Sequence, residues 1–174
     1  AKGARYIAKA LGVKKIIIGI ESNKPDAVRA FEAFEDIQPV ILRKQYPAGG
    51  EKQIIYTTTG RRLGIKKLPA DVGVIVQNVG TCFAVYDAIE NGKPLIERAL
   101  TVSGKAVKEP KNLWVKVGTP VRDIVEYCGG ESLTPKKVVT GGPMTGNAVA
   151  SYDVYTRKTT SGVLLLSEKE AAAE

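Results

Sequence analysis

Hydrophobic positions at the start of the chain first keep a helical spacing and then form a strand-like run. The helical stripe consists of Ala4, Ile7, Ala8 and Leu11. Gly12 follows it at a position where glycine commonly ends a helix. Lys15 to Ile20 is a short β-branched run, which predicts a strand buried on both faces. Pro25 suits the first turn of a second helix, and Val40 to Leu42 predicts a second strand.

The same alternation of helices and strands continues to about residue 92. After a turn at Gly49 and Gly50, the expected elements are a helix over 51–59, a basic loop over 61–71, a buried strand over 72–76 and a helix over 81–91. Gly60 and Gly92 follow these two helices and favour their ends. Short parallel strands joined by helices form α/β layers. Residues 1–92 are therefore predicted to form a Rossmann-like parallel α/β layer, so the fold class is α/β.

A different pattern begins after Lys93. Residues 96–103 and 113–117 alternate between apolar and polar positions, which predicts a β-hairpin with a longer loop. A short helix is expected over 120–127. These elements indicate a small β-grasp domain over residues 93–137. We expect it to pack on the α/β layer, because so few residues bury little core of their own.

The last part of the chain, residues 138–174, is expected to be a return segment that packs on the core and ends in a polar tail. Strands are expected at Val138–Val139 and Val163–Leu166, and the tail runs from Glu168 to Glu174. The glycine-rich loop from Gly141 to Gly146 lacks the G-K-[ST] ending of a phosphate-binding loop. A packing turn is the better interpretation of that loop.

Charge and composition limit the kinds of partner. The formal net charge is +8, but the Lys and Arg residues are scattered and aromatic residues make up only 6% of the chain. A nucleic-acid surface needs clustered cations, commonly with exposed aromatics. We therefore expect a solvated basic surface and no nucleic-acid partner, while attraction to nucleotide phosphates or anionic lipid stays open. No apolar run approaches the roughly 18 residues of a membrane span.

Histidine and cysteine usage excludes several kinds of chemistry. The chain has no histidine, which removes Ser-His and Cys-His nucleophiles and the usual zinc sites. Cys82 and Cys128 are far apart in sequence and form no C-x-x-C pair, so they cannot supply an iron–sulfur ligand set. Buried, reduced thiols are expected. No metal site is predicted.

Two stretches carry candidate binding residues where a strand passes into a helix. In Tyr46–Lys52, Gly49 and Gly50 let the backbone approach a ligand, and Glu51 stands at the helix start, where amides bind anions. In Val76–Thr81, Gln77 and Asn78 offer amide groups that can recognise a flat heterocycle. Ligands of open parallel sheets gather at such strand ends.

Each candidate also has a purely structural interpretation. The glycine pair could be only a tight turn, and Thr81 could simply cap a helix. Glu21, after the first strand, could meet a ribose or a nicotinamide amide, whereas Ser22 or Asn23 could cap the next helix. Taken alone, the spacing favours the structural interpretations. Two such loops, each at a strand end, keep a nucleotide pocket open as the alternative interpretation.

Several stretches, in this order, resemble the RnfC subunit of the Rnf electron-transport complex. They are IGIESNKPDA (18–27), YPAGGEKQII (46–55), LPADVGVIVQNVGT (68–81), GTPVRDIVEYCGG (118–130), VVTGGPMTG (138–146) and KTTSG (158–162). The chain is more distantly similar to the flavin-bearing, NADH-oxidising subunit of respiratory complex I and to cobalamin reductases. The resemblance covers nearly the whole chain.

The resemblance implies a flavin domain followed by a soluble-ligand-binding β-grasp (SLBB) domain. It also implies FMN and NADH as cofactors, with electrons passed on to [4Fe–4S] clusters and ferredoxin. Tyr46, Gly49, Gly50 and Glu51 match one flavin/NADH loop of the complex I relative, and Val76, Gln77, Asn78 and Thr81 match a second. Gly50 stands where that relative has a second carboxylate, and Gln77 stands where it has the first of two asparagines.

For the whole subunit, the resemblance implies an NADH:ferredoxin-type oxidoreductase on the cytoplasmic side of a bacterial membrane. Its partners would be other Rnf subunits, with membrane contact only through them. The family's glycine-rich flavin loop and cluster cysteines would flank this chain, which begins in what looks like mid-helix. We therefore expect an internal piece that is inactive alone and binds FMN weakly or not at all. A docking module without a cofactor and a cobalamin reductase are the alternatives.

Overall fold

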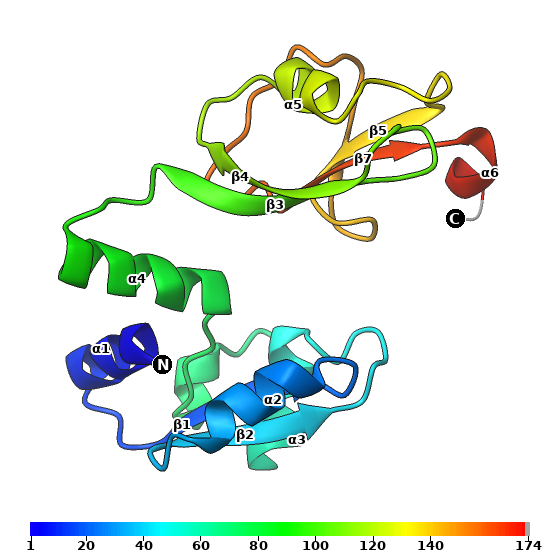
Figure 1. Cartoon of the computed structure of the whole chain (residues 1–174). Helices are drawn as coiled ribbons and strands as arrows, with labels where there is room; N and C mark the ends of the chain where they lie inside the picture. The colour runs from blue at the N-terminus through cyan, green and yellow to red at the C-terminus, as the bar shows by residue number, and fades with distance from the viewer. Residues whose placement is uncertain (173–174) are drawn as a thin grey trace. The chain divides into compact units, whose positions relative to one another are not determined.

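A computed structural model describes residues 1–172 of the chain (Figure 1). The chain divides into two compact units, Ala1–Pro94 and Leu95–Glu174. The first unit contains a parallel pair of strands with helices, and the second contains a mixed sheet with helices. The α/β prediction is therefore confirmed.

The first unit is built on two short parallel strands. β1 (Ile16–Glu21) pairs with β2 (Ile37–Leu42) in a register that runs from Ile16 opposite Ile37 to Glu21 opposite Leu42. The helix α2 (Pro25–Glu32) connects them, and Pro25 occupies its first turn as predicted. Because the strands are parallel, the loops that follow them leave from the same edge of the sheet.

Three further helices complete the first unit, and their ends follow the glycine pattern. They are α1 (Lys2–Leu11), α3 (Glu51–Thr59) and α4 (Val79–Asn91). Gly12, Gly60 and Gly92 terminate them with φ between 62° and 71°, the left-handed region that glycine adopts at low cost. These helices are confirmed, and α3 has the predicted bounds.

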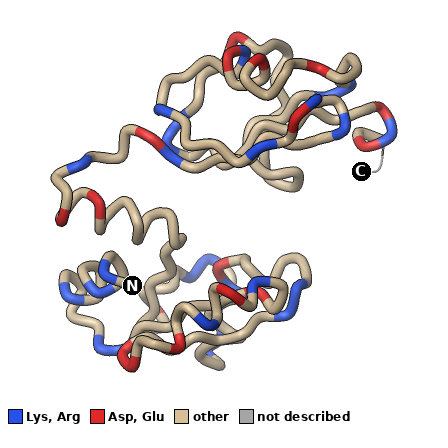
Figure 2. The backbone as a smooth tube through the Cα atoms, in the orientation of Figure 1, with Lys and Arg blue, Asp and Glu red and all other residues tan. Residues whose placement is uncertain are grey.

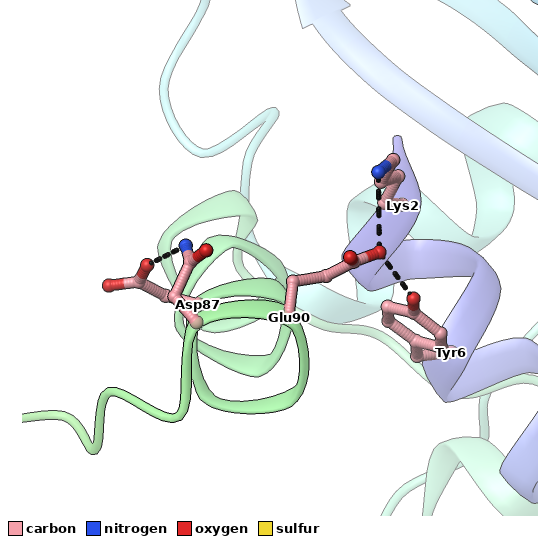
Figure 3. Close-up of polar contacts among 5 residues, drawn as sticks. Lys2, Tyr6, Asp87 and Glu90 are labelled. Carbon is pink, nitrogen blue, oxygen red and sulfur yellow. Dashed lines mark hydrogen bonds and ion pairs between the residues drawn. The ribbon is translucent and has the colours of Figure 1, made fainter.

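Helices α1 and α4 approach each other unusually closely. A Cβ atom on Gly3 would lie 1.7 Å from the backbone oxygen of Cys82, so only glycine fits at this crossing. On the same pair of helices, Glu90 Oε1 accepts hydrogen bonds from Lys2 Nζ at 3.3 Å and from the Tyr6 hydroxyl at 2.5 Å (Figure 3). The bond from Tyr6, aided by Lys2, holds the pKa of the Glu90 carboxyl below its ordinary value. Backbone contact and polar contact thus join the two helices.

The predicted strand over 72–76 is wrong. Residues Pro69–Val72 form the 3-10 helix η1, and the chain from Val74 to Asn78 belongs to no strand. The Arg61 guanidinium donates to the backbone oxygens of Val72 at 2.7 Å and Gly73 at 3.0 Å. These bonds occupy carbonyl groups that a sheet ladder would have used, so a side chain replaces the strand pairing.

The burial predicted for β1 is also wrong. Among its residues only Ile20 is buried, and the others are half-buried. The reason is that Ile16, Ile17 and Ile18 border two open cavities instead of a filled core.

The second unit is a five-stranded sheet in the order β4-β3-β7-β5-β6. Its strands are β3 (Glu97–Ser103), β4 (Lys111–Lys116), β5 (Lys137–Thr140), β6 (Asn147–Val149) and β7 (Gly162–Leu166). β3 and β4 form the predicted antiparallel hairpin, and β3 runs parallel to β7. The helix α5 (Val121–Tyr127) starts directly after Pro120, as predicted.

The core of this unit lies between its sheet and α5. The buried side chains that form it come from 100–107, Val115, α5, Cys128 and β7. Val163 and Leu165 on β7 are fully buried beside Val102 of β3. The second unit therefore has a core of its own.

The predicted boundary at residue 137 does not divide this sheet. The expected return segment supplies β5, β6 and β7, so its strands belong to the same unit as the hairpin. The expected polar tail contains α6 (Glu168–Ala171), where Glu170 Oε2 accepts from the Ser167 backbone at 2.9 Å and the Lys105 backbone at 3.1 Å. The last two residues of that tail lie outside the described residues.

The close crossing of α1 and α4 predicts a strong effect of Gly3→Ala. The added methyl group cannot avoid the Cys82 backbone, so the helices must separate, and we expect a loss of about 2 to 3 kcal/mol in the first unit. Amide hydrogen exchange in α1 and α4 measures it. Gly64→Ala is the matched control, because a Cβ atom there meets only Lys67 Cγ at 3.5 Å. Equal protection in both variants would contradict the packing argument.

The Glu90 contacts predict a pH dependence of the same helix pair. A carboxyl with a lowered folded-state pKa stabilises the fold above its ordinary value of 4.5, and this contribution is lost as the pH falls through the lowered value. Glu90→Gln should therefore weaken exchange protection in α1 and α4 at pH 7, and the difference from the unmodified chain should shrink towards pH 3. Glu32→Gln, an exposed carboxylate on α2, is the control. A difference that does not change with pH would rule out this role for the Glu90 charge.

Candidate functional site

The carboxyl edge of the β1–β2 pair brings together two of the predicted segments. Glu21 is the last residue of β1 and lies opposite Leu42, the last residue of β2. The backbone N–H of Ser22 donates to the Leu42 oxygen at 2.8 Å, which extends this pairing by one step. After Leu42 the chain leads to the predicted Tyr46–Lys52 stretch. Glu21 and the start of this connection therefore lie at the same edge of the sheet.

The Tyr46–Glu51 segment is a pair of tight turns that leads into α3. The N–H of Ala48 donates to the Gln45 oxygen, and the N–H of Gly50 donates to the Pro47 oxygen, both at 2.7 Å. Gly50 is the N-cap of α3, and no side chain caps this helix start. Glu51 in the first turn is exposed, and Tyr46 is 69% exposed. Uncapped amides at a helix start are suited to bind an anionic group.

Gly49 and Gly50 have different structural reasons to be glycine. A Cβ atom on Gly50 would meet Gln53 Oε1 at 2.6 Å and the Pro47 oxygen at 3.0 Å, so local packing accounts for this glycine. A Cβ atom on Gly49 would meet nothing within 4 Å, and its φ is not in the left-handed region. No contact within the described residues requires glycine at position 49. The open space above Gly49 instead leaves its backbone accessible to a ligand.

The second predicted group lies at the start of α4. Asn78 caps this helix, because its Oδ1 accepts from the Gly80 backbone at 2.8 Å. The Asn78 backbone oxygen also accepts from Thr81 at 3.0 Å and Cys82 at 3.1 Å. The cap that sequence analysis considered for Thr81 is thus provided by Asn78, three residues earlier. Gln77 is exposed, and Val76 is half-buried.

Two cavities of the first unit adjoin this second group. A cavity of about 620 Å³ is lined by Val76 and Gln77 together with parts of α1, β1 and α3. A second cavity, of about 420 Å³, is lined by Gln77 with parts of α1, β1 and α4. The walls of both are mainly aliphatic, and the larger also has Lys14, Lys15 and Arg61 at its lining. These three cations were not predicted as site residues, although the doublets Lys14–Lys15 and Arg61–Arg62 are visible in the sequence.

The predicted residues do not all meet in one cavity. Val76 and Gln77 line the cavities, whereas the other predicted residues line neither: Glu21, Tyr46, Gly49, Gly50, Glu51, Asn78 and Thr81. One group of predicted residues thus lies at the carboxyl edge of the β1–β2 pair and the segment after it, and the other lies around the start of α4. Each group presents exposed polar atoms.

The Gly141–Gly146 loop is a packing turn between β5 and β6. A Cβ atom on Gly146 would lie 2.6 Å from both the Gly142 oxygen and Val139 Cγ1. The loop therefore closes on itself and on β5 at Gly146, which agrees with a packing turn.

The described residues contain no set of three or more His, Cys, Asp or Glu side chains placed to hold a metal ion. Cys82 and Cys128 are free, and burial raises the pKa of both thiols. A raised pKa keeps a thiol neutral and unreactive at physiological pH.

Lys and Arg are spread along both units, as the sequence indicated (Figure 2). No helix within residues 1–172 is long and apolar enough to cross a membrane.

Comparisons with known proteins agree with this architecture. The model of the Nuo51 FMN-binding domain family matches residues 1–87, and the SLBB domain model matches residues 100–148. The C subunit of the proton-translocating ferredoxin:NAD(+) oxidoreductase complex of Clostridium ljungdahlii is 47% identical over 171 residues. The C subunit of the ion-translocating oxidoreductase complex of Rhodobacter capsulatus is 39% identical over 175 residues. A third relative, the C subunit of the Na(+)-translocating ferredoxin:NAD(+) oxidoreductase complex of Acetobacterium woodii, is 39% identical over 173 residues.

These alignments cover 97%, 98% and 97% of this chain but only 37%, 34% and 39% of the three relatives. The chain thus spans little more than a third of their length. The resemblance inferred from the sequence motifs is confirmed. The chain belongs to the Nuo51 FMN-binding domain family, and with its SLBB domain it corresponds to a segment of the C subunit of the ion-translocating oxidoreductase complexes.

Proposed function

We propose that this chain is part of a subunit that passes electrons between NADH, FMN and iron–sulfur clusters, with ferredoxin as the further partner, in a membrane-associated complex. The order of an FMN-binding domain and an SLBB domain supports this proposal. So do the names of relatives that act as ferredoxin:NAD(+) oxidoreductase subunits. The subunit would lie at the cytoplasmic side of the membrane, and the other subunits of the complex would be its neighbours.

The observation that carries the proposal is the accessible backbone at Gly49. It lies next to a helix start that no side chain caps, in the segment that follows β2. Ligands of parallel sheets bind at the carboxyl ends of the strands, and an anionic group gains from the amides of a helix start. The Tyr46–Glu51 segment therefore fits one side of a bound flavin nucleotide.

FMN, when bound, accepts a hydride from a nicotinamide and releases its electrons one at a time. The residues of this chain would position it. The Gly49 backbone would allow a planar ring or a phosphate to approach closely, and the first amides of α3 would donate hydrogen bonds to it. Glu51, exposed at the start of α3, would orient the nicotinamide nucleotide, with Tyr46 and Glu21 at the border of the site.

The second group would contribute from the start of α4. The Gln77 side chain is exposed and can donate and accept hydrogen bonds at the edge of a heterocycle. Asn78 is already engaged as a helix cap, so its role would be to fix the geometry of Val76, Gln77 and Thr81. Of the candidate residues only Val76 and Gln77 line the two cavities, and the described residues hold no metal-binding set, so we propose that the rest of the FMN site and the iron–sulfur ligands come from other residues of the whole subunit.

Gly49→Ala tests the flavin contact in the full-length subunit. The methyl group meets no atom of this chain, so folding should be unchanged, whereas FMN affinity should fall about tenfold, equivalent to about 1.4 kcal/mol. Flavin content after dialysis and fluorescence titration measure the affinity. Gly142→Ala is the matched control, because its nearest contact, Thr145 Oγ1, is 3.7 Å away. Unchanged FMN affinity of the Gly49 variant would remove this segment from the site.

Glu51→Gln separates a nucleotide role from a structural one. An exposed acidic residue in a first helical turn contributes about 0.3 to 1 kcal/mol through the helix dipole, so stability should change little. NADH oxidation by the full-length subunit should fall about tenfold or more if Glu51 orients the nicotinamide nucleotide. Glu168→Gln, in the first turn of α6, controls for loss of a first-turn carboxylate. Parallel losses of melting temperature and activity in the Glu51 variant would make Glu51 structural.

A further inference from the structure

We propose that the loop Arg61–Leu68, which follows α3, binds the surface of an anionic lipid bilayer. It combines the most exposed aliphatic side chain of the first unit with a local excess of cations. Ile65 is 89% exposed and Leu68 is 69% exposed. Large aliphatic side chains are costly to leave in water, so two on one short loop indicate a surface that is covered in use.

The sequence around these aliphatic residues carries an excess of cations. Between Glu51 and Asp71 the chain carries the cations Lys52, Arg61, Arg62, Lys66 and Lys67 and no carboxylate. Asp71 is bound at the base of the loop, where its Oδ2 accepts from the Leu68 backbone at 2.9 Å. Arg61 is bound there too, through the oxygens of Val72 and Gly73. Arg62, Lys66 and Lys67 are exposed in the loop itself.

The loop has a defined conformation in the described structure. Lys66 adopts φ 61°, a left-handed conformation that residues other than glycine seldom take. The Lys67 N–H donates to the Gly64 oxygen at 3.3 Å, which closes a turn around Ile65. The Arg62 guanidinium lies 5.6 Å from the centre of the Tyr56 ring, on the preceding helix. The aliphatic tip and the neighbouring cations are therefore held next to each other before binding.

This combination fits a bilayer better than an acidic protein or a free phosphate. Aliphatic side chains that enter the boundary of the acyl chains, with Lys and Arg at the headgroups, are typical of interfacial membrane binding. Arg and Tyr also suit that interface, because each has an apolar body and a polar end. An acidic protein or a phosphate would use the cations but would leave Ile65 in water. The proposal adds a direct lipid contact to the membrane contact expected through partner subunits, and it does not depend on the flavin site.

Vesicle flotation with the full 174-residue chain tests the proposal. Vesicles of phosphatidylglycerol and phosphatidylcholine should carry the chain upward in the gradient, and vesicles of phosphatidylcholine alone should not. One juxtamembrane cation contributes about fivefold to binding on anionic lipid, so Lys66→Gln/Lys67→Gln should weaken binding about 25-fold. Ile65→Ser/Leu68→Ser should weaken it by about tenfold or more, because two aliphatic side chains no longer leave water.

Matched controls distinguish this loop from general attraction to a basic protein. Lys9→Gln/Lys24→Gln makes the same change in net charge at other exposed positions of the first unit and should weaken binding by less than about threefold. Ile65→Trp should give a blue-shifted fluorescence emission with anionic vesicles. Ile89→Trp, at a 57% exposed position of α4, should not. The native Trp114 is present in both variants, so its fluorescence contributes equally to the two emission spectra.

Three results would overturn the proposal. The first is no flotation of the unmodified chain with anionic vesicles, as expected if the loop serves an acidic protein. The second is equal weakening by the loop and control charge variants. The third is that Ile65→Ser/Leu68→Ser binds anionic vesicles as tightly as the unmodified chain and the Ile65→Trp emission does not shift. Binding would then come from the surface charge alone, without insertion of the aliphatic side chains. Circular dichroism of each variant confirms that the exposed substitutions leave the fold intact.

Discussion

The first unit depends on the contact between Gly3 and the backbone of Cys82. Two helices can approach this closely only where one of them has no side chain, and a Cβ atom at Gly3 would overlap the Cys82 oxygen. The hydrogen bonds from Lys2 and Tyr6 to Glu90 join the same two helices (Figure 3). This pairing holds the first turns of α4 against α1, where Val79 and Cys82 line the same two cavities as Ile16–Ile18 of β1.

The candidate site follows from a second constraint, the parallel pairing of β1 and β2. It places Glu21 at the same edge as the end of β2, from which the chain leads to Gly49 and the start of α3. The second unit does not share this dependence, because its core is formed by its own sheet and α5. The second unit can therefore keep its shape through its own packing.

Local signals in the sequence predicted most elements, and long-range pairing accounts for the errors. Gly12, Gly60 and Gly92 ended their helices as expected, because a left-handed residue needs no tertiary partner. The run 72–76 has strand-like residues, but Arg61 binds its carbonyls, which no local pattern shows. Likewise, only the pairing of β3 with β7 assigns the end of the chain to the second sheet. For the candidate site, the sequence motifs predicted two binding loops, but the cavities beside Val76 and Gln77 depend on how α1, β1 and α3 pack, which no local pattern shows.

In the proposed function, the segment from Tyr46 to the first turn of α3 lies against FMN in the whole subunit. Amide hydrogen exchange of the full-length subunit, with and without FMN, is the sharpest test of this contact. We expect FMN to slow exchange at residues 49–53, whose helix-start amides have no side-chain cap, and to leave exchange in β3 and β4 of the second unit unchanged. Saturating FMN that leaves residues 49–53 exchanging at their unbound rate would contradict it.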